Sequence, residues 1–445
     1  MTLTERPAAD ERRDGPARRG PLRTALPMLP VLWTEARRSV APWTGVCTAL
    51  TLIVAMAAKA DSWQGDWGAT QDLLHSGATL LGGPLVAAAA CWQGARDHRR
   101  RTGELWASTP RARWSRQAAA ALPLALWAVT GYAVALAASL LATRPYAGGG
   151  GPSPSVAVAD GAFLVAAALA GFAAGVLCRW RLAAPAVAAL MYLVLGVPTY
   201  TESAARYLDP AMNSSQEDRL PVWWYAPAMA LWLCGLAVAA LTAVAARRRL
   251  AALVPLAVAA AVAPLIVSTG DGLFREDPAA DRLVCTEGSP QFCLPGRQEH
   301  LLPQVAEALS GLTGRLEGVR GAPKRYVGRL PLHGPDEAWI PAPHPGWYLL
   351  RGRLQRTEDF AWQVAANMMD RMCPNSHHQN ADGPPVDVAY GAVATWLAPA
   401  GLAPGAEKPP ELLRLEAMPD AERRAWLGRY LTTRRSCDPS EVPVL

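Results

Sequence analysis

The sequence RDHRRRTGELWASTPRARWSR (residues 96–116) separates two long apolar segments, residues 73–92 and 118–143. Neither segment contains Asp, Glu, Lys or Arg. Each is long enough to cross about 30 Å of hydrocarbon as a helix, because a helix rises about 1.5 Å per residue. The charged stretch is therefore predicted to be a loop between two membrane-spanning helices.

The same kind of apolar run recurs along the first 270 residues. A charge at mid-membrane costs roughly 2.5–3.5 kcal/mol, so runs of this length without charge are typical of membrane spans. Beyond residue 270, charged residues, prolines and short helical patterns take over. The predicted fold is a membrane-spanning all-α helical bundle (residues 41–270) followed by a soluble, mostly helical α+β domain (residues 271–445). The seven predicted spans are residues 41–58, 73–92, 118–143, 161–178, 182–200, 222–246 and 251–269.

The positions of the arginines predict the orientation, because Lys and Arg next to spans are retained in the cytoplasm. The basic segments, all predicted to lie inside, contain Arg6, Arg12, Arg13, Arg18, Arg19, Arg23, Arg37, Arg38, Arg96, Arg99, Arg100, Arg101, Arg111, Arg113, Arg116, Arg179, Arg181, Arg247, Arg248 and Arg249. The alternate loops are sparse in charge or acidic, and carry Lys59, Asp61, Asp66, Asp72, Arg144, Asp160, Glu202, Arg206, Asp209, Glu217, Asp218 and Arg219. With seven spans, the N-terminus is predicted to be cytoplasmic and the C-terminal domain extracytoplasmic.

The net charge of +6 has the same origin. The first 270 residues carry 24 basic and 15 acidic residues, whereas the C-terminal domain is slightly acidic. The excess of basic residues is thus explained by attraction to the inner membrane surface, and a nucleic-acid partner is not expected.

The first forty residues are not typical of a cleavable secretory signal. Residues 1–24 have no apolar face and are predicted to form a disordered cytoplasmic tail. Residues 25–40 are compatible with an amphipathic helix in the inner membrane interface, and also with a plain linker.

The eight cysteines divide between the two parts of the chain. Cys47, Cys91, Cys178 and Cys234 lie in or beside predicted spans, where a thiol behaves as a small apolar group. An even number in an oxidising compartment predicts disulfides, so the four in the C-terminal domain can pair in three ways. We favour Cys285 with Cys293 and Cys373 with Cys437.

Apolar periodicity predicts several elements in the C-terminal domain. Residues 298–319 are predicted to form one amphipathic helix, and residues 324–332 and 347–354 to be extended. A helix at residues 357–373 is expected to begin with Thr357 as its N-terminal cap. Further helices are predicted at residues 386–397 and 420–435.

Catalytic motifs are missing from the sequence. It contains no GxxxxGK[ST], HExxH or GxSxG, so no enzyme activity and no cofactor is predicted. Cys373, His377, His378 and Cys437 could in principle bind zinc, but disulfide pairing is favoured and no metal is predicted. His75 is the one protonatable group found near a span end, so ion-coupled transport is disfavoured. The motif GFAAG (residues 171–175) permits close helix packing without identifying the partner helix.

The loop at residues 96–116 carries more than charge. Thr102 can cap a short helix with Glu104 in its first turn, and Pro110 would end it. Such a loop could simply be solvated or face lipid. Leu105 and Trp106, however, would be exposed apolar side chains, which need lipid or a protein groove to cover them.

This run resembles the loop between the second and third spans of ABC-2 type transporter permeases, most closely those of actinobacteria. In that family the loop contains a coupling helix that docks on a separate ATP-binding subunit. The resemblance implies that the contact residues here are Arg99, Arg100, Arg101, Glu104, Leu105, Trp106, Thr109, Pro110 and Arg111. Two features depart from the family pattern, namely the seventh span and the large C-terminal domain.

The expected function is therefore that of a permease-like subunit in the cell membrane, without an ATPase of its own, that exports an unidentified substrate. The expected partners are a separate ABC ATP-binding subunit, the lipid bilayer, and a second permease in a homodimer or heterodimer. The alternative is a membrane-anchored extracytoplasmic domain that binds a ligand or acts as a sensor.

Overall fold

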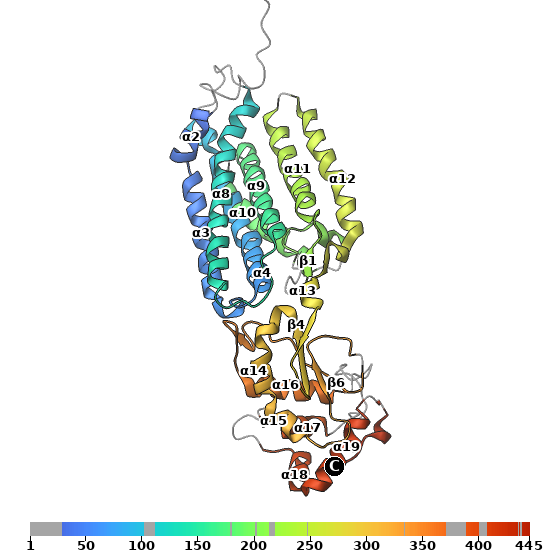
Figure 1. Ribbon diagram of the computed structural model, residues 1–445. Helices are drawn as coiled ribbons and strands as arrows, with labels where there is room; N and C mark the ends of the chain where they lie inside the picture. Colours follow the sequence, from blue (N-terminus) through green and yellow to red (C-terminus); the bar gives the residue numbers. More distant parts are fainter. Residues whose placement is uncertain are drawn as a thin grey trace, which may run out of the picture.

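The computed structural model describes residues 29–101, 112–178, 180–200, 203–212, 219–246, 248–332, 334–370, 389–399, 407–434, 436 and 438–445. The chain forms a long helical bundle, with a smaller sheet-containing domain at one end of it (Figure 1). We call the end of the bundle that meets this C-terminal domain the domain end, and the opposite end the loop end.

Six helices in the described residues are long and apolar enough to span a membrane. One of them is a continuous helix from Trp67 to Arg100, built from α4 (Trp67–Gly77), the π-helical turn η3 (Ala78–Gly82), α5 (Gly83–Gly94) and α6 (Arg96–Arg100). The other five contain α3 (Ala41–Ala58), α8 (Arg113–Thr143), α9 (Pro154–Leu177), α11 (Tyr225–Ala245) and α12 (Leu253–Thr269).

The fifth predicted span, residues 182–200, contains a shorter apolar helix, α10 (Ala183–Gly196). Its 14 residues rise about 21 Å, less than the thickness of a hydrocarbon core. Pro198 follows shortly after its end and begins the 3₁₀ turn η4 (Pro198–Tyr200). The prediction of seven full-length helices is thus confirmed for six.

A short helix, α2 (Leu29–Arg38), lies at the loop end, away from the C-terminal domain (Figure 1). Glu35 of α2 forms a salt bridge with Arg96 at 3.0 Å, and both side chains are about one-fifth exposed. The indole nitrogen of Trp127 in α8 donates to the carbonyl of Ala36 at 2.8 Å. Helix α2 is therefore fixed to both helices that flank the loop at residues 96–116.

The GFAAG motif packs α9 against α5. A Cβ added to Gly171 would clash with the backbone of Ala87, and one added to Gly175 would clash with the backbone of Cys91. From the other side, Gly94 of α5 lies directly against the carbonyl of Phe172. The absence of side chains at these glycines lets the two helix backbones touch over about two turns.

The C-terminal domain contains a mixed four-stranded sheet in the order β3 (Leu283–Cys285), β4 (Gln291–Pro295), β5 (Arg325–Val327) and β6 (Glu337–Trp339). Strands β3 and β4 form an antiparallel hairpin, whereas β4, β5 and β6 run parallel. Parallel strands need a long crossover connection. Between β4 and β5 it is the helical segment η8 (Gly296–Leu301), α14 (Leu302–Ala308) and α15 (Ser310–Arg315), whereas the described part of residues 328–336, which join β5 to β6, contains no helix.

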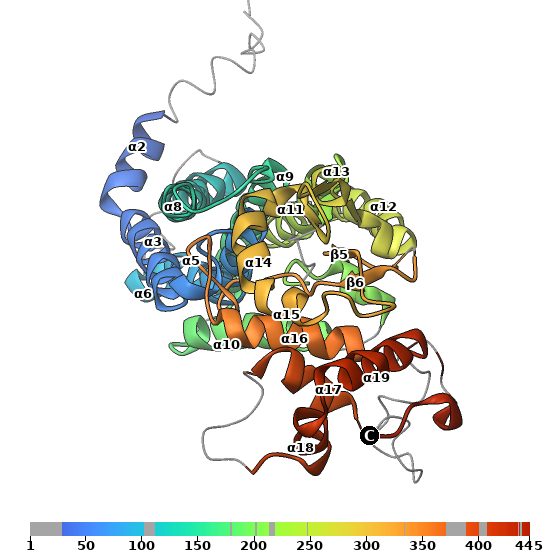
Figure 2. The same cartoon turned by 60° about the horizontal axis from the view of Figure 1, so that its bottom comes forward.

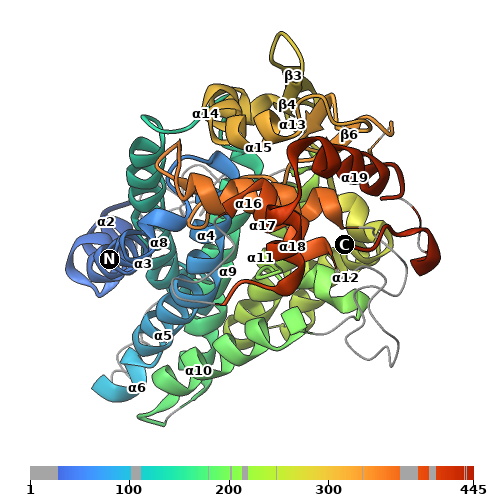
Figure 3. The same cartoon turned by 90° about the horizontal axis from the view of Figure 1, so that it is seen from below.

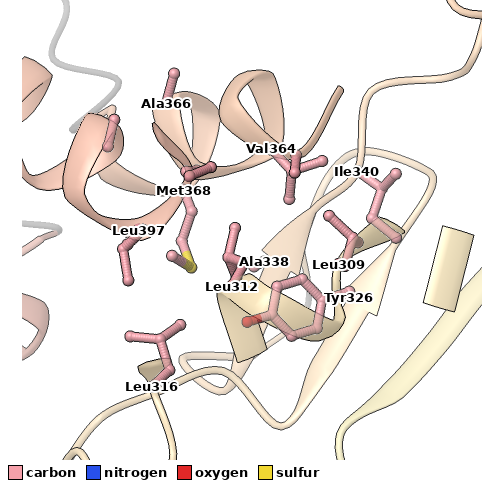
Figure 4. Close-up of a cluster of buried hydrophobic side chains, with 14 of the residues drawn as sticks. Leu309, Leu312, Leu316, Tyr326, Ala338, Ile340, Val364, Ala366, Met368 and Leu397 are labelled. Carbon is pink, nitrogen blue, oxygen red and sulfur yellow. The ribbon is translucent and has the colours of Figure 1, made fainter. Parts of the chain in front are cut away.

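The core of this domain lies between the sheet and the helices. Figure 4 shows Val364 and Met368 of α16 (Thr357–Met369) facing Leu309, Leu312 and Tyr326, all of which are buried. The last elements are α17 (Tyr390–Leu397), α18 (Pro410–Ala417), α19 (Asp420–Thr432) and the 3₁₀ turn η10 (Pro439–Glu441).

Two local predictions for this domain are wrong. The helix predicted over residues 298–319 is divided into three short pieces, because Pro303 lies in the first turn of one of them and Gly311 and Gly314 weaken the next. Thr357 is the first helical residue of α16 and not its cap. The capping position is Arg356, which has φ = 50° and pairs with Asp359 at 2.7 Å.

The C-terminal domain lies across the domain end of the bundle (Figure 2, Figure 3). Strand β1 (Arg219–Pro221), which precedes α11, pairs with β2 (Phe274–Glu276), which follows α12. Nε of Arg351 in the C-terminal domain donates to Oε1 of Gln64, at the domain end of the bundle, at 3.0 Å. At Gly352, with φ = 70°, a Cβ would clash with the backbone of Tyr146, so two loops meet there without side chains between them. These contacts attach the domain at several points and not through a linker alone.

The first of the two favoured disulfides is present, and joins Cys285 to Cys293 across the β3–β4 hairpin. Cys373 and Cys437 lie outside the described residues. The four bundle cysteines are free.

Removing this bridge with Cys285→Ala and Cys293→Ala together is expected to destabilise the hairpin by about 2.5 kcal/mol, the loop-closure entropy of a nine-residue ring. Hydrogen exchange of the full chain should show faster exchange of the β3 and β4 amides. The same experiment on Cys47→Ala, which removes a free exposed thiol, should leave those amides unchanged. Unaltered protection of the hairpin in the double variant would contradict this prediction.

Candidate functional site

The predicted contact loop is only partly described. Arg99 and Arg100 lie in α6, and Arg101 ends it with φ = 54°. The guanidinium of Arg99 stacks on the ring of Trp92, 3.8 Å from the ring centroid. The remaining predicted contact residues, Glu104, Leu105, Trp106, Thr109, Pro110 and Arg111, lie outside the described residues.

The two ends of this loop are positioned by contacts at the loop end of the bundle. The Glu35 carboxylate receives hydrogen bonds from both terminal nitrogens of Arg96, each at 3.1 Å or less. His98 contacts the carbonyl of Val176 at the end of α9 at 2.8 Å. The structure thus places the start of the loop, helix α2 and the end of α9 together.

A second cluster, which the sequence did not reveal, is buried nearer the domain end. Nδ1 of His75 in α4 lies 2.5 Å from Oδ1 of Asp160 in α9. The hydroxyl of Tyr132 in α8 donates to Oδ2 of the same carboxylate at 2.7 Å. All three side chains are almost fully buried, so three polar groups from three helices meet inside an apolar bundle.

This cluster corrects two predictions. Asp160 was assigned to an external loop, but α9 begins at Pro154, and Asp160 therefore lies in its second turn, roughly 10 Å along the helix. His75 was the one protonatable group identified near the spans, and the structure gives it a carboxylate partner. Buried protonatable groups are therefore present among the helices, and their scarcity no longer disfavours ion-coupled transport.

Two further hydrogen bonds attach α4 to the same neighbours. The hydroxyls of Thr70 and Thr143 are 2.7 Å apart, which joins α4 to the end of α8. The Gln71 amide donates to the carbonyl of Ser153 and accepts from its N–H, at 2.8 and 2.6 Å. The π-helical turn η3 begins three residues after His75, and π turns recur at functional sites in helices.

Asp209 is a further ionisable side chain close to this cluster. It follows the 3₁₀ turn η5 (Ala204–Leu208), and its side chain is only 8% exposed. Burial raises the pKa of Asp209 to about 6, although the N–H of Ala211 and the charge of His75 act in the opposite direction. His75 also hydrogen-bonds the backbone of Met212, so the segment containing Asp209 and Met212 is attached to the cluster.

The chemistry available to this site is proton binding. Imidazole, carboxyl and phenol groups can each hold or release a proton. No group of three or more His, Cys, Asp or Glu side chains in the described part of the chain is arranged to hold a metal ion.

The C-terminal domain contains a hollow of about 770 Å³. Arg423 lines it, but this side chain donates to the backbone carbonyls of Leu415, Glu416 and Met418 and pairs with Asp420. Lys408 is paired with Glu416 at 2.8 Å. These four charged side chains are thus paired with each other, and Arg423 also joins α19 to α18.

The chain was compared with protein-family models, with curated proteins and with solved structures, and no significant match was found.

Proposed function

We propose that this chain is a permease-like membrane subunit that acts with a separate ATP-binding protein. The observation that supports the proposal best is the shared attachment of α2 to both sides of the loop at residues 96–116. Arg96, at the start of the loop, pairs with Glu35, and α8, which follows the loop, is joined to Ala36 through Trp127. A force applied to the loop would therefore move α2 together with α6 and α8, the helices on either side of the loop.

The continuous helix Trp67–Arg100 extends this path. It carries the loop at one end and His75 near the other. Its α5 section touches α9 through glycines along about two turns, so the two helices would move as one body. An ATPase docked at the loop end could in this way change the packing at the domain end.

We further propose seven membrane crossings, with α10 and η4 making the fifth. The chain enters α10 from the end of α9 that contacts His98, and it leaves toward Met212, whose backbone bonds His75 near the domain end. This placement is consistent with a cytoplasmic loop end, where the basic residues Arg37 and Arg38 lie, and with a disulfide in the C-terminal domain on the outside.

A second permease, identical or homologous, would cover part of the apolar surface in this proposal, and lipid would cover the rest. Large side chains of α10 and α12 are exposed, among them Leu190, Leu193, Val194, Leu253, Val254 and Leu265. Since surfaces of this kind are not stable in water, they require lipid or another helix.

The ATPase partnership predicts that an ATP-binding protein co-purifies with the full chain from native membranes in mild detergent. Glu104→Arg, which reverses a charge at the predicted contact, should reduce its recovery at least about tenfold, as expected for loss of a close charge pair. The matched control is Glu287→Arg, which reverses an exposed charge in the β3–β4 hairpin. Purification of the intact subunit without any ATPase, or equal recovery with both variants, would refute the proposal.

A further inference from the structure

Asp209 has a buried oxygen that is not satisfied by the described residues. Its Oδ1 accepts a hydrogen bond from the N–H of Ala211 at 2.9 Å. Its Oδ2 is buried and has no hydrogen-bond partner in the described part of the chain. An ionised carboxylate in this position lacks the donors that water would supply, whereas a protonated carboxyl group is neutral and loses much less on burial.

The groups around Asp209 make the site rich in acids. Besides Asp209, the site has the carboxylates of Asp160 and Asp72 and the imidazole of His75. The other ionisable groups close by are tyrosines and one exposed ion pair. The titratable and charged groups that face the site are His75 and Asp72 of α4, Tyr132 of α8, Asp160 of α9, Tyr225 of α11, and Arg206 and Tyr207 of η5 with their partner Asp271. A proton is the smallest cation that can reduce this excess of negative charge.

We propose that Asp209 and the His75–Asp160 pair form a proton-binding site, and that proton binding holds residues 203–212 against the helical bundle. The mechanical link is already in place, since the backbone of Met212 is bonded to His75 and the Asp209 turn is closed by Ala211. This inference does not depend on an ATPase partner.

The direction of the pH effect follows from the burial of Asp209. Its pKa in the folded chain is raised from 3.8 to about 6. Because the pKa is raised in the folded chain, the buried position of Asp209 is fully stable below pH 3.8, its ordinary pKa. This stability is lost progressively as the pH rises through about 6. The segment should be closed in acid and looser at neutral pH.

The experiment measures the rate at which a cysteine introduced into residues 203–212 reacts with a maleimide. The full chain is reconstituted in nanodiscs, and the exposed Cys47 and Cys178 are replaced by alanine. Ala211→Cys places the thiol at a buried position, and Ala204→Cys at an exposed position in the same segment. The ratio of the two rates removes the intrinsic pH dependence of thiol reactivity. This ratio should rise about tenfold between pH 5 and pH 7.5.

Asp209→Asn cannot ionise, so the ratio in this variant should stay low at every pH. An independent readout is the infrared carbonyl band of a protonated carboxylic acid, which should titrate near pH 6 in the natural chain. The band should disappear in Asp209→Asn. It should persist in the control Asp61→Asn, which removes an exposed carboxylate at the same end of the bundle. A flat ratio in the natural chain, the same slope in Asp209→Asn, or a band that survives in Asp209→Asn would overturn the proposal. Replacing sodium with N-methylglucamine should leave the profile unchanged, and a shift would assign the site to a metal cation instead.

Discussion

Replacing Asp160 with alanine is expected to lower the free energy of unfolding by roughly 3–5 kcal/mol, the usual cost of removing one partner from a buried ion pair. The carboxylate is 2% exposed and serves two helices at once, because it accepts from Tyr132 and pairs with His75. Without it, an imidazole and a phenol remain buried in an apolar bundle with no acceptor in the place of Asp160.

The measurement is unfolding of the purified full chain in mixed detergent micelles by increasing SDS, followed by tryptophan fluorescence. Asp61→Ala, which removes an exposed carboxylate at the same end, is the matched control and should change stability by less than about 0.5 kcal/mol. Equal stability of the two variants would show that the cluster contributes nothing to the fold.

A compensated variant separates stability from function. Replacing His75 and Asp160 with leucine and Tyr132 with phenylalanine removes every polar group of the cluster at similar volume. Apolar replacement of a whole buried pair is often neutral or stabilising, so most of the loss should be recovered. The pH response of residues 203–212 should nevertheless become weaker, because the hydrogen bond from His75 to the backbone of Met212, which attaches this segment to the bundle, would be lost.

Most of the bundle could be predicted from the sequence, because hydrophobic runs report directly which residues can lie in hydrocarbon. The bounds of α3, Ala41–Ala58, coincide with the predicted span. A charged residue usually marks the end of a span, and Asp160 is an exception. Asp160 looked like a loop residue since the apolar run begins at residue 161, yet the helix begins seven residues before that run.

The buried cluster depends on contacts that a sequence pattern does not encode. His75 and Asp160 are 85 positions apart in the sequence. The sequence alone does not distinguish an aspartate that is paired inside the bundle from one that is exposed to water. A helical register for residues 154–177 would have indicated that Asp160 is buried, because Val156 and Phe163 lie on the same buried face of the helix. In contrast, the Cys285–Cys293 pairing was predictable, because a nine-residue ring brings the thiols together locally.

The GFAAG motif lies between these two cases. Its spacing predicted close helix packing, but Ala-rich helices offer many equivalent surfaces, so the partner could not be chosen from sequence. The structure selects α5, whose own Gly94 completes the contact from the other side.

Replacing both Gly171 and Gly175 with alanine is expected to destabilise the chain by roughly 3 kcal/mol or more, as two overpacked sites in one interface. Each new methyl group would meet backbone atoms of α5, at Ala87 and Cys91, which cannot move aside as a flexible side chain would. The whole helix must shift instead. In an open helix the same change would be favourable by up to about 1 kcal/mol per residue, because alanine has the higher helix propensity.

The matched control uses this difference. Gly161 of the same helix has its nearest neighbour 3.9 Å from the added Cβ, and Gly196 at the end of α10 has none within 4 Å, so the double variant Gly161→Ala, Gly196→Ala should be neutral or slightly stabilising in the same SDS unfolding assay. If both double variants behave alike, the α5–α9 contact is not tight. If only the GFAAG variant loses stability while it keeps its ATPase partner, the contact serves folding. If the GFAAG variant also abolishes an ATP-dependent conformational change at the loop end, α5 and α9 act as the single rigid body that the proposed coupling requires.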